Sequence, residues 1–294
     1  MVSAIITTYK RAPEIVERAI LSVLYQTYGD IEIIVVDDSP RDYKLRSAVR
    51  ETVKKYENRN VKYIEHEKNS GACVARNTGI ANSSGEYVGF LDDDDEWLPT
   101  KIEKQISVFK ESDDNTAIVY CGKYVVNEIT KETYEYTTSF YEGYLFEKLL
   151  EENFIGSTSF PLIKRTALEE IGGFNPDMPA SQDYDVWLKI SQKYSVRYVD
   201  EPLVNYHIHE GDFISKDPTK KIIAIEKIND MYCDYFSNNK KIVWKRNMEL
   251  VESYAAKKSY FISLRILFRM ISISPSKVMK SVRFFLRGIK RSLQ

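Results

Sequence analysis

Strand-like and helix-like segments alternate through the N-terminal part of the chain, and this alternation limits the fold more than any other feature. Runs rich in β-branched residues predict strands, and apolar residues at helical spacing predict helices. The predicted strands are 2–7, 31–36, 61–64 and 86–91, and the predicted helices are 12–28, 41–56, 71–81 and one that starts at Pro99. Strands joined through helices form βαβ units, so this part of the chain predicts a parallel sheet flanked by helices.

Polar residues follow three of these predicted strands. Thr7 and Tyr9 lie at the end of the first strand, Asp38 lies at the end of the second, and Asp92–Asp95 follow the fourth. In open parallel sheets, ligands bind beyond the carboxyl ends of the strands. We therefore expect a ligand site where the three clusters converge.

The run Asp92–Asp95 places four carboxylates in a row directly after a buried strand. Like charges repel, so solvent or a cation must offset the repulsion. Oxygen ligands suit Mg²⁺ and Mn²⁺, and in an extended stretch Asp92 and Asp94 point to the same side. The run predicts either a cation site that also grips a diphosphate or a solvated acidic turn.

Composition removes several classes of protein. The chain has 294 residues, which is long enough for a large core, and 43% of them are hydrophobic. Three Cys without CxxC spacing argue against a disulfide scaffold and a cysteine zinc site. The first strand is not followed by a glycine-rich phosphate loop, which disfavours a dehydrogenase and a nucleotidyltransferase. Without a long apolar run or a signal-peptide pattern, we expect a cytoplasmic protein.

The middle of the chain predicts a mixed pattern. Strands are expected at 117–126 and, as its hairpin partner, 132–138, and short strands at 197–199 and 204–207. Helices are expected at 164–171 and 183–192, with Asp183 as the N-cap of the second. From about residue 220 the pattern is helical to the end, with a break near Ser274 and Pro275.

Seven segments carry a resemblance to a known family. In order they are VSAIITTYKR, ILSVLYQTY, IEIIVVDDS, NSGACVARNTGIANSSGEYVGFLDDDDEWLP, KRTALEEIGGFNPDM, QDYDVWLKI and YHIHEGDFIS. Together they resemble the inverting nucleotide-sugar glycosyltransferases of family 2 over roughly residues 1–215. The resemblance implies an α/β fold of the GT-A type, a Rossmann-like, mostly parallel mixed sheet flanked by helices, with a helical C-terminal extension. We expect a catalytic domain at 1–219 and a helical region at 220–294.

The resemblance also implies donor contacts. Thr7, Tyr9 and Asp38 correspond to contacts with the nucleotide base and ribose, and Asp93 reaches the ribose. Arg76 lies near a Gly-rich helix start where an anion can sit, or simply on a helix face in water. From the residues alone, Asp38 is equally suited to capping the following helix.

Metal ligands and the base are implied in the same way. Asp94 and Asp92 resemble the family's metal-binding DXD pair for Mn²⁺ or Mg²⁺. His209 resembles a histidine near the metal or diphosphate, with His207 as the alternative. Asp183 matches the catalytic base, although many members carry Glu where this chain has Gln182; on sequence alone Asp183 is equally an N-cap.

These roles predict an inverting transfer of a sugar from a nucleotide sugar, expected to be a UDP-sugar, to an acceptor hydroxyl. A carboxylate takes the proton of the hydroxyl as it attacks, and a divalent cation neutralises the leaving diphosphate. The expected acceptor is a glycan or a lipid-linked glycan in polysaccharide assembly. The alternative is a catalytically silent partner subunit that only binds nucleotide sugar.

The C-terminal segment is basic. Residues 257–294 hold ten Lys and Arg, whereas all 43 acidic residues precede them. An apolar arc lies opposite a basic arc within 276–294, and its residues are Val278, Val282, Phe285, Leu286, Ile289 and Leu293. The pattern predicts a peripheral contact with an anionic membrane on its inner face, or a helix docked on the body, or a homodimer contact. Nucleic acid is disfavoured because the body is acidic.

Overall fold

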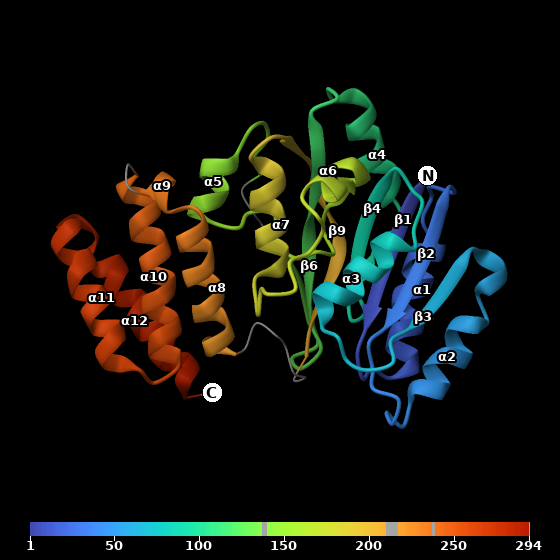
Figure 1. The fold of residues 1–294 in the computed structure, drawn as a ribbon, viewed down its shortest axis with the longest axis horizontal. Coiled ribbons are helices and arrows are strands. Elements are labelled where there is room, and N and C mark those ends of the chain that lie inside the picture. Colours follow the sequence, from blue (N-terminus) through green and yellow to red (C-terminus); the bar gives the residue numbers. More distant parts are fainter. Residues whose placement is uncertain (137–139, 210–216, 237–238, 294) are drawn as a thin grey trace. The chain divides into compact units, whose positions relative to one another are not determined.

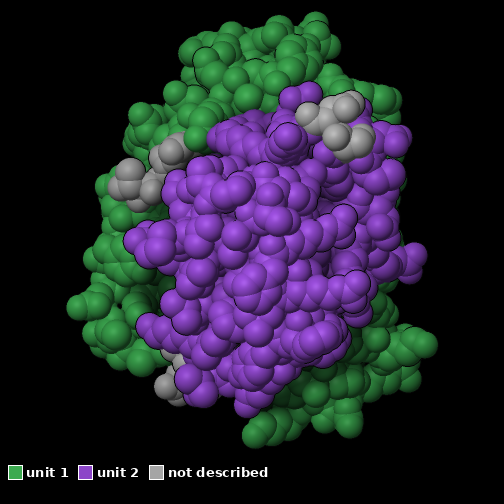
Figure 2. Space-filling model, turned by 90° about the vertical axis from the view of Figure 1, so that its left-hand side faces the viewer, with its two compact units in different colours: residues 1–146, 154–176, 186–210 green, residues 147–153, 177–185, 211–294 purple. Residues whose placement is uncertain are grey.

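The computed structural model describes residues 1–136, 140–209, 217–236 and 239–293. The chain divides into two compact units, which Figure 2 distinguishes by colour. Unit 1 holds residues 1–146, 154–176 and 186–210, and unit 2 holds residues 147–153, 177–185 and 211–294. The predicted division of the chain at residue 219 stays a prediction.

Among the described residues, unit 1 contains one nine-stranded sheet (Figure 1). Its order is β3-β2-β1-β4-β8-β6-β9-β5, and β7 pairs with β6. The strands are β1 Val2–Thr8, β2 Ile31–Asp37, β3 Val61–Glu65, β4 Tyr87–Asp92, β5 Glu96–Trp97, β6 Thr116–Asn127, β7 Glu132–Tyr136, β8 Leu162–Lys164 and β9 Ser195–Ile208. The β3-β2-β1-β4 part is parallel, and β8 joins it antiparallel. The expected mixed, largely parallel sheet is confirmed.

The register of the parallel part brings the polar strand ends together. Thr8 pairs with Asp37 on one side of β1, and Thr7 pairs with Asp92 on the other. The carboxyl ends of β1, β2 and β4 therefore lie side by side, as the sequence predicted.

Helices cover both faces of this part of the sheet. In unit 1 these are α1 Pro13–Leu24, α2 Arg46–Lys54, α3 Ala72–Ala81, α4 Lys101–Glu111 and α6 Arg165–Glu170. Apolar residues of α1, α2 and α4 share a core with the even-numbered residues of β1, such as Ala4 and Ile6. On the opposite face α3 lies so close to β1 that a Cβ at Gly79 would be 2.3 Å from Ile5 Cγ2. Small residues in α3 thus allow close packing against the strand that carries Thr7.

Three boundary predictions are wrong. The helix predicted at 12–28 ends at Leu24. Residues 41–45 form turns, and α2 begins only at Arg46. The two short strands predicted at 197–199 and 204–207 are one strand, β9, which runs beside β6 with register shifts around Gly122. Pro202 and the close approach of Glu201 to Gly122 interrupt the pairing without ending the strand. Proline cannot donate to the ladder, so the sequence reads there as a break.

The predicted hairpin is confirmed as far as it is described. β6 pairs antiparallel with β7, from Lys123 opposite Tyr136 to Asn127 opposite Glu132. Thr138, the predicted end of the second strand, lies outside the described residues.

Unit 2 is helical where it is described. It contains α8 Pro218–Met231, α9 Cys233–Phe236, α10 Lys240–Ala256, α11 Tyr260–Ile273 and α12 Val278–Ser292, together with most of α5 Phe146–Glu151. The predicted break falls between α11 and α12, at a short 3-10 turn, Pro275–Lys277. None of the described helices is both long and apolar enough to cross a membrane.

The predicted apolar arc of α12 is not a single exposed surface. Val278, Val282, Phe285 and Ile289 are half-buried, and only Leu286 and Leu293 are exposed. α12 packs on α10 within unit 2, so the docked-helix alternative describes one side of the helix. The prediction of a membrane contact stays a prediction.

Candidate functional site

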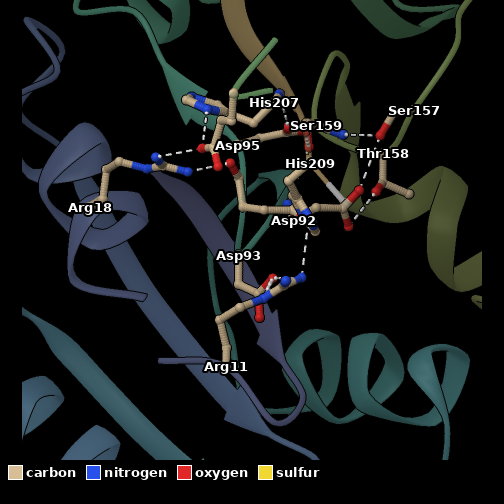
Figure 3. A network of polar contacts seen from close by, with 12 residues as sticks. Arg11, Arg18, Asp92, Asp93, Asp95, Ser157, Thr158, Ser159, His207 and His209 are labelled. Atoms are coloured by element: carbon tan, nitrogen blue, oxygen red, sulfur yellow. Dashed lines mark hydrogen bonds and ion pairs between the residues drawn. The ribbon is translucent and has the colours of Figure 1, made fainter. Parts of the chain in front are cut away.

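Four aspartates turn the chain at the end of β4. The Asp95 N–H donates to the Asp92 carbonyl at 3.0 Å, which closes the turn before β5. Figure 3 shows the network around this turn. Each of the four carboxylates has hydrogen-bonding partners in the protein, so the repulsion between them is offset by protein groups and not by water alone.

Asp92 faces one arginine and two hydroxyls. Arg76 Nη2 donates to Oδ1 at 2.9 Å, and the hydroxyls of Thr158 and Ser157 donate to Oδ1 and Oδ2 at 3.2 and 3.1 Å. The Arg76 guanidinium lies 5.3 Å from the centre of the Phe174 ring. The aromatic face and the carboxylate fix Arg76 toward the site, so the alternative of a helix face in water is wrong for this residue.

Asp93 and Asp94 share Arg11. Arg11 Nε donates to Asp93 Oδ1 at 2.9 Å, and Nη2 donates to Asp94 Oδ2 at 3.0 Å. Asp93 is buried, and this burial raises the pKa of its carboxyl while Arg11 opposes the rise. Asp94 Oδ2 also lies 2.9 Å from His209 Nε2. The guanidinium thus holds two neighbouring carboxylates in place.

Asp95 points into the protein. Its Oδ2 accepts from the Ser159 hydroxyl at 2.6 Å, and its Oδ1 accepts from the His207 backbone N–H at 3.2 Å. Burial, followed by repulsion from Asp92 and Asp94, raises the pKa of Asp95 well above its ordinary value. Asp95 therefore holds the turn against β9, and the partly exposed residues of the run are Asp92 and Asp94.

The two histidines at the end of β9 have different surroundings. His207 is buried, and its ring nitrogens lie 2.9 Å from Glu128 and from Glu96. The hydrogen bond from His207 lowers the pKa of Glu96. His209 instead meets Asp94. The geometry favours His209 over His207 as the histidine of the acidic run.

Comparison with known proteins identifies the family. The model of "Glycosyl transferase family 2" matches residues 3–172. The chain belongs to this family. It is 30% identical over 259 residues to an uncharacterized glycosyltransferase of Haemophilus influenzae, covering 86% of this chain and 82% of the relative. It is also 30% identical over 273 residues to the putative colanic acid biosynthesis glycosyl transferase WcaA of Escherichia coli, covering 85% and 93%.

A Rickettsia typhi relative, also an uncharacterized glycosyltransferase, is 33% identical over 217 residues; the match covers 72% of this chain and 65% of the relative. Among solved structures, S. aureus TarS residues 1–349 in complex with UDP-GlcNAc match with a TM-score of 0.61 and 16% identity. That match covers 98% of this chain and 88% of TarS 1–349. At this identity the likeness shows the fold, and the expected GT-A fold is confirmed.

Both carboxylate oxygens of Asp38 in this glycosyltransferase have hydrogen-bond partners. Its carboxylate accepts from the backbone N–H groups of Ser70 and Gly71 at 2.8 Å each, and it lies 2.7 Å from His66 Nδ1. Gly71 is the N-cap residue of α3. Asp38 therefore ties the loop before α3 to the end of β2, whereas the alternative prediction had it cap the helix that follows β2.

Thr7 and Tyr9 lie beside the acidic run. Thr7 is half-buried and pairs with Asp92 across the sheet, and Tyr9 is exposed just beyond β1. Both positions border the carboxyl ends of the strands. Their contacts with a donor stay predictions.

Asp183 belongs to unit 2, whereas the acidic run belongs to unit 1. Helix α7, Gln182–Ser191, begins one residue before Asp183, and the Ser181 carbonyl accepts the Asp185 N–H at 3.1 Å. The prediction of Asp183 as N-cap is therefore wrong. Its Oδ1 accepts the Tyr184 N–H at 2.8 Å, which places the carboxylate in the first turn of a helix.

Several site residues escaped the sequence analysis. They are Arg11, Arg18, His66, Ser157, Thr158 and Ser159. Arg18 Nη2 donates to the Asp94 carbonyl at 2.7 Å. Arg11 and His66 lie in loops, and Ser157, Thr158 and Ser159 follow no periodic pattern. Strand pairing sets the place of Ser157, Thr158 and Ser159: β8 lies between β4 and β6, which brings the segment before β8 against the end of β4.

Proposed function

We propose that this glycosyltransferase moves a sugar, with inversion, from a UDP-sugar to a hydroxyl of a glycan or lipid-linked acceptor in polysaccharide assembly. The observation that carries the proposal is the run Asp92–Asp94 at the carboxyl ends of β1 and β4, bound on its sides by Arg11 and Arg76. A cationic rim around carboxylates fits a ligand that combines a diphosphate with a metal ion. The TarS complex with UDP-GlcNAc supports uridine diphosphate as the nucleotide of the donor. The E. coli relative, whose name refers to colanic acid biosynthesis, supports a role in polysaccharide assembly.

The residues at the acidic run fit a divalent cation held by few protein ligands. Asp94 and His209 lie within 2.9 Å of each other, and Asp92 keeps part of its side chain in solvent. The described residues hold no group of three or more His, Cys, Asp or Glu side chains that would cage an ion. Mg²⁺ and Mn²⁺ sites of this kind are completed by substrate phosphates. When bound, the cation would neutralise charge on the leaving diphosphate.

The donor contacts are proposed for Thr7, Tyr9, Asp38, Asp93 and Arg76. Arg76 Nη2 lies 2.9 Å from Asp92 Oδ1 and would add a positive charge beside a bound diphosphate. Asp38 fixes the loop before α3, so it shapes the nucleotide site even where its own oxygens are occupied.

Asp183 is proposed as the base. The acceptor oxygen attacks the anomeric carbon, its proton passes to Asp183, and the bond from that carbon to the diphosphate oxygen breaks. UDP leaves with the bonding electron pair, and the single displacement inverts the centre. The first turn of α7 favours the ionised carboxylate before the transfer.

Calorimetry with UDP, GDP and dTDP, each with and without Mn²⁺, tests the donor site. We expect UDP to bind only with the metal, and Asp94→Ala to abolish this binding. The matched control is Asp114→Ala, an exposed aspartate outside the site. Failure of every nucleotide to bind would refute the proposed site.

A second experiment tests Asp183 as the catalytic base. It measures the slow release of UDP from UDP-GlcNAc by the wild type and by Asp183→Asn. Asp183→Asn is expected to keep UDP affinity and to lose turnover by at least a hundredfold. Binding without turnover in the wild type would instead support the silent-partner alternative and overturn the proposed transfer.

A further inference from the structure

Helices α11 and α12 expose more large apolar side chains than their length explains. Of the eighteen exposed large apolar residues among the described ones, seven lie in these two helices and an eighth, Leu293, directly follows α12. Five of them we call the apolar seam: Phe261, Phe268, Met279, Leu286 and Leu293, with exposed fractions of 81, 65, 73, 56 and 79%. Scattered exposed apolar residues are normal, whereas a cluster marks a binding surface.

The side of each helix that faces α10 is made of small or core residues. On α12, Ser281 is fully buried and accepts the Trp244 Nε1–H at 3.1 Å, and a Cβ at Gly288 would lie 2.3 Å from the Glu252 carbonyl oxygen. On α11, the buried Ser263 donates to the Val251 carbonyl at 2.6 Å. These contacts fix which way each helix is turned.

A second side of each helix faces the other. The rings of Tyr260 and Phe285 lie 6.5 Å apart, and the Tyr260 hydroxyl lies 3.3 Å from the Ser292 hydroxyl. α11 and α12 are joined by the short turn Pro275–Lys277, so they run antiparallel. These contacts define two sides of α11 and of α12: the side that faces α10 and the flank that faces the other helix.

On each helix the apolar seam lies beside the flank that faces the other helix. Successive residues turn by about 100°, so Leu286 and Leu293 follow the flank of α12 that faces α11, on the side away from α10. Phe261 and Phe268 occupy the matching position on α11. The seam therefore lies along the line where the two helices meet, on the face turned away from α10.

Basic residues lie on the outer edges of the same face. Continuing around each helix beyond the seam leads to Arg265 and Arg269 on α11, and to Arg283 and Lys290 on α12, all of them exposed. No acidic residue occurs in 257–294. The face is thus an apolar strip with a positive border on both sides.

We propose that this face of α11 and α12 binds the surface of an anionic lipid bilayer, with the seam among the acyl chains and the arginines and lysines at the headgroups. The surface includes α11 and is therefore wider than residues 276–294. A second copy of the same face would bring positive borders together, which disfavours self-association. This inference goes beyond the proposed transfer and does not depend on it.

Co-sedimentation of the full chain with vesicles tests the proposal. We expect binding to phosphatidylcholine vesicles that contain phosphatidylglycerol, and little binding to phosphatidylcholine alone. Phe268→Ser with Leu286→Ser should weaken binding by about tenfold or more. The matched control, Tyr25→Ser with Ile129→Ser, removes side chains that are 65 and 55% exposed in unit 1 and should leave binding unchanged.

Charge reversal tests the basic residues of the surface independently of the apolar seam. Arg265→Glu with Arg283→Glu should also weaken binding by about tenfold and reduce its dependence on salt. Lys54→Glu with Lys110→Glu, both exposed in unit 1, is the control. Circular dichroism confirms that each variant folds.

Three results would overturn the proposal. The first concerns vesicles: either the seam variant binds as well as the wild type, or the wild type does not bind to anionic vesicles. The second is a dimer in analytical ultracentrifugation that Leu286→Ser dissociates. The third is binding to an acidic peptide in preference to vesicles. UDP affinity, measured separately, shows whether the donor site is intact in each variant.

Discussion

Lys101 is an ammonium group in the core of unit 1, and its removal tests how the protein tolerates that charge. The side chain is fully buried, donates to Gln105 Oε1 at 2.8 Å and lies 4.1 Å from the centre of the Trp97 ring. Burial lowers the pKa of Lys101 to about 8 from an ordinary value of 10.5. The charged form is therefore less stable in the folded protein than in the unfolded chain.

The sign of the pH dependence follows from this shift. Between pH 8 and 10.5 the unfolded chain binds more protons than the folded one, so the free energy of unfolding rises with pH. Linkage gives a gain of about 2 kcal/mol between about pH 7 and 9.5. The Trp97 ring stabilises the ammonium by about 1 kcal/mol, so we expect a gain of about 1 to 2 kcal/mol.

Urea unfolding of the wild type and Lys101→Met, followed by circular dichroism at several pH values, measures this gain. The difference between the two proteins cancels the titration of all other groups. Lys104→Met, which removes a more exposed lysine three residues on, is the control and should show no such trend. A difference that stays constant within about 0.3 kcal/mol from pH 7 to 9.5 would refute the argument that burial sets the pKa.

Three further predictions follow from the site and from unit 2. Because the pKa of Asp95 is raised, its carboxyl stays protonated to a higher pH in the folded protein than in the unfolded chain, and the free energy of unfolding falls as pH rises above about 4. Asp95→Asn should lessen this fall, and an unchanged pH profile in urea unfolding would contradict the prediction. His209→Ala should weaken Mn²⁺-dependent UDP binding by roughly tenfold with little change in melting temperature. His207→Ala should instead lower the melting temperature, because it removes the hydrogen bonds of the buried ring to Glu96 and Glu128; equal effects on both measurements would rule out the distinction. Gly288→Leu should destabilise unit 2 by roughly 1–3 kcal/mol, since its Cβ meets the Glu252 carbonyl oxygen; wild-type stability in thermal unfolding would show that α12 does not pack there.

Local pattern was enough to predict the parallel half of the sheet. β1, β2, β3 and β4 each start and end within two residues of their predicted positions, because each is a short apolar run bounded by polar or turn residues. Since the carboxyl ends of parallel strands share one edge, the meeting of Thr7, Asp38 and Asp92 also followed from sequence. Charge counting likewise located the basic C-terminal helices.

Tertiary structure decided what each carboxylate does. Four consecutive aspartates look alike in sequence, yet Asp95 is buried against Ser159 while Asp94 meets Arg11 and His209. These partners come from distant segments, and their positions depend on which strands pair. Sequence periodicity predicts which segments form strands, but it does not specify which strands lie side by side.

The same holds for the C-terminal helices. The sequence determined that α11 and α12 are apolar and basic, because composition and period are local properties. Only packing decided which of their faces stay exposed. Ser281 and Gly288 let α12 approach α10 closely, so the helix docks on its smallest residues and leaves Leu286 and Leu293 in solvent. Close approach between helices depends on the shape of both partners, which one helix sequence does not contain.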